Sequence, residues 1–211
     1  MSALRGMNLH LRLLSRLRWK TLTIPGTNLI LKTPHSTDFE QWVSLRQASE
    51  AFLRPWEPEW PKDDLTKLGF QRRLKAYAQQ RQSGWGRTYF LHDTERGLLI
   101  GGISLTRIVH GISHSATLGY WMGVHHANQG HMKKTVPAFL DHAFDDLGLN
   151  RVEAACVPAN SRSIHLLTSC GFHKEGFARE YLEINGMMED HVLFARLKSD
   201  RLAVSRTTNR T

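Results

Sequence analysis

The segment from Gly119 to Val136, GYWMGVHHANQGHMKKTV, constrains the fold of this chain most strongly. It begins with the apolar and aromatic residues of a strand, continues through a short polar stretch that contains Gly130, and ends as the basic start of a helix. The first amides of a helix lack internal partners and the helix dipole is positive there, so an anionic ligand is favoured beside Gly130. The spacing matches neither GxxxxGK[ST] nor GxGxxG, which argues against nucleoside triphosphates and dinucleotides.

The size and charge of the chain limit its class. A length of 211 residues with 41% hydrophobic residues predicts one domain with a real core. The net charge of +9 favours a polyanionic partner, such as the ribosome or nucleic acid, or an anionic cofactor. Cys156 and Cys170 stand in no CxxC or metal-binding spacing, and no apolar run approaches the roughly 20 residues of a membrane span. We expect a reduced, cytoplasmic protein without a signal peptide.

Both ends of the chain differ from its middle. No acidic residue occurs from Met1 to Thr37, so residues 1–24 are expected to form a basic extension: an anchor, a targeting peptide or a loosely docked segment. Residues 25–198 are expected to form the domain, and residues 199–211 a polar tail that ends in SRTTNRT.

Hydrophobic periodicity and turn residues predict the elements of the middle part. A strand in TNLILKTP precedes a helix capped at Ser36 or Thr37, and the proline-rich FLRPWEPEWP is a structured loop or a helix entrance. A second helix ends at Gly84, and three strands follow as a meander. Then come a helix over residues 130–147, the strand RVEAACVP, the helix SRSIHLLTSC, and a hairpin that turns at Asn185-Gly186. The order β-α-α-β-β-β-α-β-α-β-β describes a mixed α/β domain.

This order, with the loop at Gly130, resembles the acyl-CoA-binding segment of the GNAT acetyltransferases. Their loop, Gln/Arg-x-x-Gly-x-Gly/Ala, wraps the pyrophosphate of coenzyme A, and here it reads from Ala127 to Met132, so the first and last positions depart from the pattern. The ordered blocks FLRPWEPEWP, GYWMG, LGLNRVEAACVPANSRSIHLLTSCGFHKEG and REYLEINGMMEDHVLFARL resemble the RimJ/RimL branch, and RimJ most, over residues 25–197. That branch acetylates the N-terminal alanine or serine of ribosomal proteins. The resemblance implies an α/β (α+β) fold with a mixed, mostly antiparallel central sheet flanked by helices.

The resemblance also implies a binding site for the co-substrate acetyl-CoA. The strand Gly119–Val124 matches the family strand that splays from its neighbour and pairs with pantetheine, and Asn160 matches the asparagine that hydrogen-bonds pantetheine. The implied donor-binding residues are Trp121, Met122, Val124, Gln129, Gly130, His131, Met132, Lys133, Lys134 and Asn160. A purely structural role remains open for several of these residues. Trp121 also suits ordinary core packing, the two lysines suit a solvated helix face, and Asn160 with Ser163 suits a helix cap.

Two catalytic residues follow from the same resemblance. Ser163 matches the serine proposed to protonate the departing sulfur, since the helix has no tyrosine near Leu167, where many GNAT enzymes carry one. Glu180 matches the family carboxylate that accepts the amine proton through water; a plain surface strand glutamate is the alternative interpretation. We expect Phe52, Trp56 and Glu57 to line the acceptor groove.

Protein N-termini are the favoured acceptors, because an α-amino group has a pKa near 7.7 to 8 and a lysine side chain one near 10.4. The alternatives are a GNAT enzyme for a small amine such as an antibiotic or polyamine, and a non-catalytic basic module that binds ribosomal RNA. We expect no membrane contact, and a monomer or homodimer.

Two other sequence patterns are not expected to form functional sites. The loop histidines His125, His126 and His131 have no carboxylate or cysteine to complete a ligand set, so no metal is expected. The pair Asp190-His191 is expected to serve strand packing.

Overall fold

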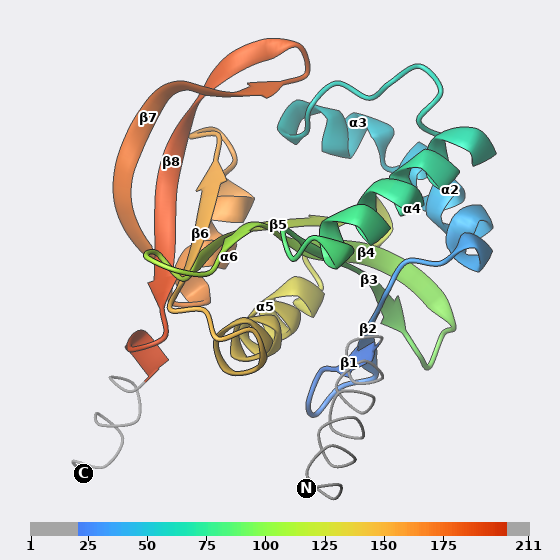
Figure 1. The fold of residues 1–211 in the computed structure, drawn as a ribbon. Helices are drawn as coiled ribbons and strands as arrows, with labels where there is room; N and C mark the ends of the chain where they lie inside the picture. Colours follow the sequence, from blue (N-terminus) through green and yellow to red (C-terminus); the bar gives the residue numbers. More distant parts are fainter. Residues whose placement is uncertain (1–20, 202–211) are drawn as a thin grey trace, which may run out of the picture.

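The computed structural model describes residues 21–201, and most of the expected basic extension and polar tail lies outside them. One sheet of eight strands runs through this part of the chain in the order β1-β2-β3-β4-β5-β6-β8-β7 (Figure 1). The strands are β1 (Thr21–Thr23), β2 (Leu29–Lys32), β3 (Arg87–Asp93), β4 (Leu98–Val109), β5 (Ser115–Met122), β6 (Arg151–Cys156), β7 (His173–Ile184) and β8 (Met187–Leu197). Only β5 and β6 pair in parallel within this sheet, so the expected mixed, mostly antiparallel fold is confirmed.

Helices cover both faces of the sheet (Figure 1). They are η1 (Ser36–Asp38), α2 (Phe39–Ala48), α3 (Glu50–Leu53), η2 (Arg54–Trp56), α4 (Lys67–Gln82), η3 (Val124–His126), α5 (His131–Asp141), the π-turn η4 (His142–Asp146) and α6 (Ser161–Ser169). Trp42 of α2 and Phe70 of α4 pack with Phe90 on one face, while Phe139 of α5 packs on the other face with Tyr89. Adjacent residues of β3 thus face opposite layers, as the strand pleat requires.

The start of the fold differs from expectation in two details. Residues Thr21 to Thr23, which were assigned to the basic extension, pair with β2, so the sheet begins ahead of residue 25. The first helical turn is capped by His35, whose side chain accepts from the amide of Thr37, and neither Ser36 nor Thr37 is the cap. A histidine ring nitrogen is an acceptor that the usual list of capping residues omits.

The pairing between β5 and β6 is short. It runs from Ser115 opposite Arg151 to Thr117 opposite Glu153, whereas β5 continues to Met122 and β6 to Cys156. Beyond Thr117 the two strands therefore diverge, and β5 keeps its ladder on the β4 side alone. The expected splay of this strand is present.

Candidate active site

A cavity of about 560 Å³ opens where β5 and β6 diverge. Its wall comes from β5, the start of α5, the end of β6, the start of α6, the segment around η2, and the β7–β8 hairpin. Of the predicted site residues, the structure brings these to the wall: Phe52, Trp56, Glu57, Trp121, Met122, Gly130, His131, Met132, Lys133, Asn160 and Ser163. Residues from distant parts of the sequence thus share one concave site of the size that small molecules occupy.

Gly130 gives the loop before α5 its shape. It is the N-cap of α5 with φ 77°, in the left-handed region that glycine enters without steric cost. A Cβ at this position would meet no atom within 4 Å, so backbone conformation and not space favours glycine. The amide of Lys134 donates to the Gly130 carbonyl (3.1 Å) as the first intrahelical bond. The amides of His131, Met132 and Lys133 have no acceptor among residues 21–201, so they are available to an anion.

Three predicted donor-binding residues lie outside the cavity wall. Val124 donates its amide to Oγ of Ser49 at 2.9 Å. Gln129 spans the loop, because its Nε2 donates to the carbonyl of His125 at 2.7 Å. These two residues therefore stabilise the loop from behind, and Lys134 is exposed beside it.

Asn160 and Ser163 combine capping with a place on the wall. Oδ1 of Asn160 accepts from the amide of Ser163 at 3.1 Å, as an N-cap does. The hydroxyl of Ser163 takes no part in this cap and lies 2.6 Å from the phenolic oxygen of Tyr120 on β5. Burial raises the pKa of Tyr120, so this phenol stays protonated at neutral pH. Two hydroxyl groups therefore meet at the point where β5 and α6 face each other.

Sequence reasoning missed Tyr120. The expectation that no tyrosine accompanies Ser163 considered α6 alone, and the phenol comes from β5, which is 43 residues away in the chain. The position of Tyr120 one residue before Trp121, in a strand already assigned to the site, was the available signal.

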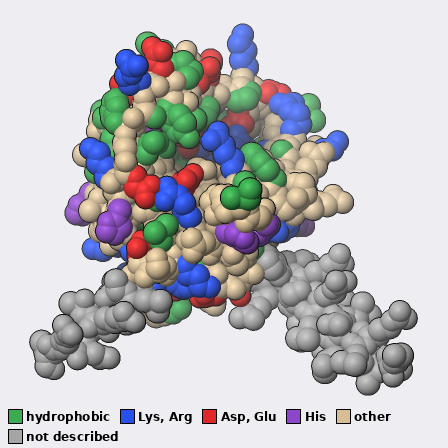
Figure 2. All heavy atoms as spheres, turned by 60° about the vertical axis from the view of Figure 1, so that its left-hand side comes forward, with side chains coloured by type: hydrophobic (Ala, Val, Ile, Leu, Met, Phe, Trp, Pro, Cys, Tyr) green, Lys and Arg blue, Asp and Glu red, His purple; other side chains and the backbone are tan. Residues whose placement is uncertain are grey.

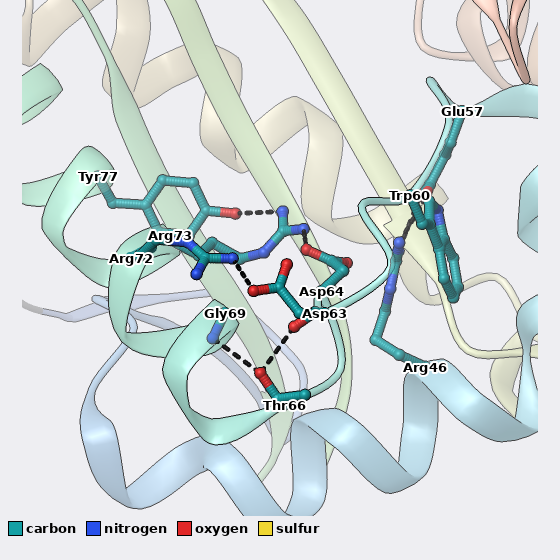
Figure 3. A network of polar contacts seen from close by, with 10 residues as sticks. All are labelled: Arg46, Glu57, Trp60, Asp63, Asp64, Thr66, Gly69, Arg72, Arg73 and Tyr77. Carbon is teal, nitrogen blue, oxygen red and sulfur yellow. Dashed lines mark hydrogen bonds and ion pairs between the residues drawn. The ribbon is translucent and has the colours of Figure 1, made fainter.

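A charged pair lies beside the part of the cavity wall that follows η2 (Figure 3). The guanidinium of Arg46 on α2 donates to both carboxylate oxygens of Glu57, at 2.8 and 2.6 Å, and Nε1 of Trp60 donates to Oε2 of Glu57 at 2.8 Å. The guanidinium also lies 4.0 Å from the ring centroid of Trp60 and 5.1 Å from that of Trp121. The bidentate ion pair of Arg46 and Glu57, together with the contacts of the guanidinium with both tryptophan rings, fixes the segment after η2 against β5.

The same segment contacts the hairpin and α6. The amide of Asn185, at the tip of the β7–β8 hairpin, donates to the carbonyl of Glu57 at 3.0 Å. The guanidinium of Arg162 lies 4.4 Å from the ring centroid of Phe52. The mouth of the cavity is therefore lined by aromatic and charged side chains that neighbouring elements hold in place.

His126 and His131 are part of the wall near the Gly130 loop. Burial is the main cause that lowers the pKa of each imidazole, and the nearby Arg96 lowers both further. The rings are consequently neutral at pH 7 and lie where an anion would meet them.

Glu180 is a correction to the sequence expectation. It does not line the cavity; with Arg179 and Asp190 it borders a separate polar depression. Between the pairs Ala178–His191 and Leu182–Glu189 the register of β7 shifts, and Glu180 takes φ 45° with its amide bonded to Oδ1 of Asp190 (2.8 Å). This bulge breaks the alternation of side chains and directs residue 180 away from the site.

Within residues 21–201, the side chains form neither a metal site nor a membrane span. No group of three or more histidine, cysteine, aspartate or glutamate side chains is arranged to hold a metal ion in this part of the chain. Among the same residues, no helix has the length and apolar character needed to cross a bilayer.

Known proteins share this architecture. A family model described as an acetyltransferase (GNAT) domain matches residues 28–173. The chain is 30% identical over 177 residues to the probable N-acetyltransferase YjcK of Bacillus subtilis, covering 84% of this chain and 98% of that protein. It is also 30% identical over 172 residues to the [ribosomal protein uS5]-alanine N-acetyltransferase of Escherichia coli, covering 82% of this chain and 89% of the relative.

Solved structures agree with these relatives. The ribosomal-protein-S5-alanine acetyltransferase of Vibrio fischeri has a TM-score of 0.76 at 28% identity, over 82% of this chain and 94% of its own. RimJ of Mycobacterium smegmatis in complex with CoA-disulfide has a TM-score of 0.78 at 25% identity, over 88% of this chain and 93% of its own.

Proposed function

The chain belongs to the GNAT acetyltransferase family, and we propose that it transfers the acetyl group of acetyl-CoA to the N-terminal α-amino group of a protein, with a ribosomal protein as the acceptor. The family makes it an acetyl-transferring enzyme. The observation that carries the finer assignment is the single cavity in which the free amides of α5, the splayed edge of β5 and the Tyr120–Ser163 hydroxyl pair converge.

The donor fits the part of the cavity between β5 and α5. A diphosphate suits the three free amides after Gly130, with Lys133 beside them, since backbone donors at a helix N-terminus favour phosphate oxygens. The amide groups of pantetheine suit the edge of β5 beyond Thr117, where the pairing with β6 ends. Trp121, Met122 and Asn160 line the same part, and the neighbour from Mycobacterium smegmatis is a complex with CoA-disulfide.

The hydroxyl groups of Ser163 and Tyr120 are suited to stabilise the thiolate of coenzyme A as it leaves. Hydroxyl donors that are held in place stabilise a developing negative charge without reorganising. Because the pKa of Tyr120 is raised by burial, the phenol remains a hydrogen-bond donor over the working pH range. We assign Ser163 to the direct contact with sulfur and Tyr120 to holding the serine hydroxyl through their 2.6 Å hydrogen bond.

An α-amino acceptor suits the opposite end of the cavity. Phe52, Trp56 and Glu57 lie on its wall, so a chain terminus meets apolar surface and negative charge there. The α-amino group needs less help to lose its proton than a lysine side chain does. We place this reaction in the cytoplasm, where ribosomal proteins are made.

The relatives also include the spermidine N(1)-acetyltransferase of Vibrio cholerae, at 29% identity over 64% of this chain. Figure 2 turns the β7–β8 side of the molecule forward, and on this face basic and acidic side chains alternate around apolar ones. Within residues 21–201, this face therefore shows no basic patch of single sign of the kind that RNA binding favours.

Acetylation of a defined panel tests the proposal. The enzyme is incubated with acetyl-CoA and peptides that begin with free Ala or Ser, with the same peptides blocked at the N-terminus but carrying an internal lysine, and with spermidine. We expect mass spectrometry to find one acetyl group on the free N-termini and none on the blocked peptides. Acetylation of spermidine alone would contradict the proposal, and a mixture of ribosomal proteins then identifies the acceptor.

A further inference from the structure

His191 of β8 is a buried histidine on the wall of the cavity. Its exposed fraction is 2%, and it lies on the wall together with Leu182, Glu183 and Ile184 of β7. The ring of Tyr181 meets it edge-on, with 5.8 Å between the ring centroids. Strand packing alone does not require an imidazole at the surface of a reaction cavity.

The hydrogen bonding of His191 fixes which nitrogen carries the proton. Nδ1 lies 2.9 Å from the carbonyl oxygen of Glu189, and a carbonyl oxygen only accepts, so Nδ1 carries the hydrogen. In the neutral ring Nε2 then has a free lone pair. Nε2 has no hydrogen-bond partner within residues 21–201 and is not enclosed, whereas Nε2 of His92 is enclosed. The lone pair of His191 is therefore open to the cavity.

The carboxylates near the acceptor end are less suited to take a proton. Both oxygens of Glu57 accept hydrogen bonds from Arg46, and Trp60 donates to one of them, which stabilises the charged form. Glu183 is exposed to solvent, and Glu180 borders the separate depression. Of these groups, His191 alone combines burial with an unpaired basic atom.

We propose that Nε2 of His191 accepts the proton which the attacking amine loses, directly or through one water molecule; this inference rests on the proposed function. The amine nitrogen forms the bond to the acetyl carbon, the bond from that carbon to sulfur breaks, and the thiolate leaves beside Ser163. The amine proton passes to Nε2, and the imidazolium releases it to solvent when the products depart. Glu189 holds the ring so that Nε2 faces the cavity.

Ionisable groups on the elements packed with His191 include Tyr181 on β7, whose ring meets it, and Glu189 and Asp190 beside it on β8. Glu57, Cys156 and Glu183 share the cavity wall with it. Since both the imidazole and the amine must be neutral, the logarithm of kcat/KM should rise with a slope of about 2 at the acid end of the profile.

His191→Asn tests this role. Asparagine places its amide nitrogen near the position of Nδ1, so the bond to Glu189 is kept while Nε2 is removed. We expect kcat/KM for an Ala-peptide to fall about 10²-fold and the acid slope to fall from about 2 to about 1, with unchanged acetyl-CoA affinity in calorimetry. His92→Asn, at another buried histidine away from the cavity, is the matched control and should keep both values.

The outcomes separate the two proposals. If the wild-type enzyme acetylates spermidine and not peptides, the proposed acceptor is wrong, and the same slope comparison with spermidine still decides the role of His191. If His191→Asn folds, binds acetyl-CoA and keeps a slope of about 2 with any acceptor, His191 is not the proton acceptor. Should the Asn variant fail to bind acetyl-CoA, His191→Gln provides the same comparison.

Discussion

The phenolic oxygen of Tyr120 and Oγ of Ser163 lie 2.6 Å apart across the cavity, one on β5 and the other on the first turn of α6. The pair joins the two elements that bound the splayed part of the sheet. This hydrogen bond fixes the orientation of the Ser163 hydroxyl. The backbone amide of Ser163 donates separately to Oδ1 of Asn160. The geometry at this point therefore depends on the side chains of Tyr120, Asn160 and Ser163, which belong to two motifs that lie far apart in the sequence.

Removal of these hydroxyls should affect turnover more than folding. We expect Ser163→Ala to lower kcat about 10²-fold and Tyr120→Phe about tenfold, since the phenol acts through the serine. The double variant should be no slower than Ser163→Ala, because residues that act as a unit are not additive. Steady-state kinetics with a peptide acceptor measures this; a double variant slowed by the product of both factors would show independent roles.

Gly130→Ala should weaken binding of coenzyme A through backbone strain. A side chain at φ 77° costs about 1 kcal/mol of stability, and relief of this strain turns the following amides away from the diphosphate. Gly84→Ala is a matched control, because Gly84 has φ 80°, also has no neighbour within 4 Å of an added Cβ, and lies outside the cavity wall. Both variants should lose similar stability in urea unfolding. Equal affinities for coenzyme A in calorimetry would refute the assignment of the Gly130 loop.

Lys133 and Lys134 should differ although they are adjacent and exposed. Lys133 lines the cavity and Lys134 does not. We expect Lys133→Ala to weaken coenzyme A about tenfold, equivalent to one charge-assisted hydrogen bond of about 1.4 kcal/mol, and Lys134→Ala to have little effect. Titrations at two salt concentrations should also show a smaller salt dependence for the first variant. Equal losses would indicate a general attraction and no specific contact.

The lowered pKa values of His126 and His131 predict a pH dependence of donor binding. In the free protein both rings resist protonation, mainly through burial, and a bound diphosphate stabilises their charged forms. Binding should therefore take up protons below about pH 6.5, and affinity for coenzyme A should rise as pH falls from about 7 to 5.5. Calorimetry in two buffers of different ionisation enthalpy measures this uptake, which His126→Gln with His131→Gln should abolish.

The same shifts act on stability with the opposite sign. The unfolded chain binds protons at the ordinary pKa of histidine, above the folded values of His126 and His131. The stability that these residues contribute is present above about pH 6.5 and decreases as pH falls below it in the free protein.

Local signals predicted much of the fold and the backbone shape of the Gly130 loop. Asn185 and Gly186 both take positive φ at the hairpin tip, as the Asn-Gly pair predicts, and Gly130 takes the backbone conformation that its place before α5 suggested. These features depend on one or two adjacent residues, so a sequence displays them directly.

Features that depend on long-range pairing were missed. The contact of Tyr120 with Ser163 requires β5 and β6 to diverge, and no local pattern specifies where a parallel pair ends. The position of Glu180 outside the cavity wall has a similar cause, since a bulge opposite Asp190 changes which face of the sheet a residue occupies. His191 was interpreted as packing because its open lone pair appears only when Glu189 is seen to bind the other ring nitrogen.

The three-residue seam between β5 and β6 makes the sheet two blocks, with five strands on one side and three on the other. If acetyl-CoA binds as proposed, the amide groups of its pantetheine arm hydrogen-bond to the edge of the first block and lie against the second, in the place of a missing strand. On the proposed function the bound donor would join the two blocks, so the sheet would be less tightly connected before acetyl-CoA binds and after coenzyme A leaves.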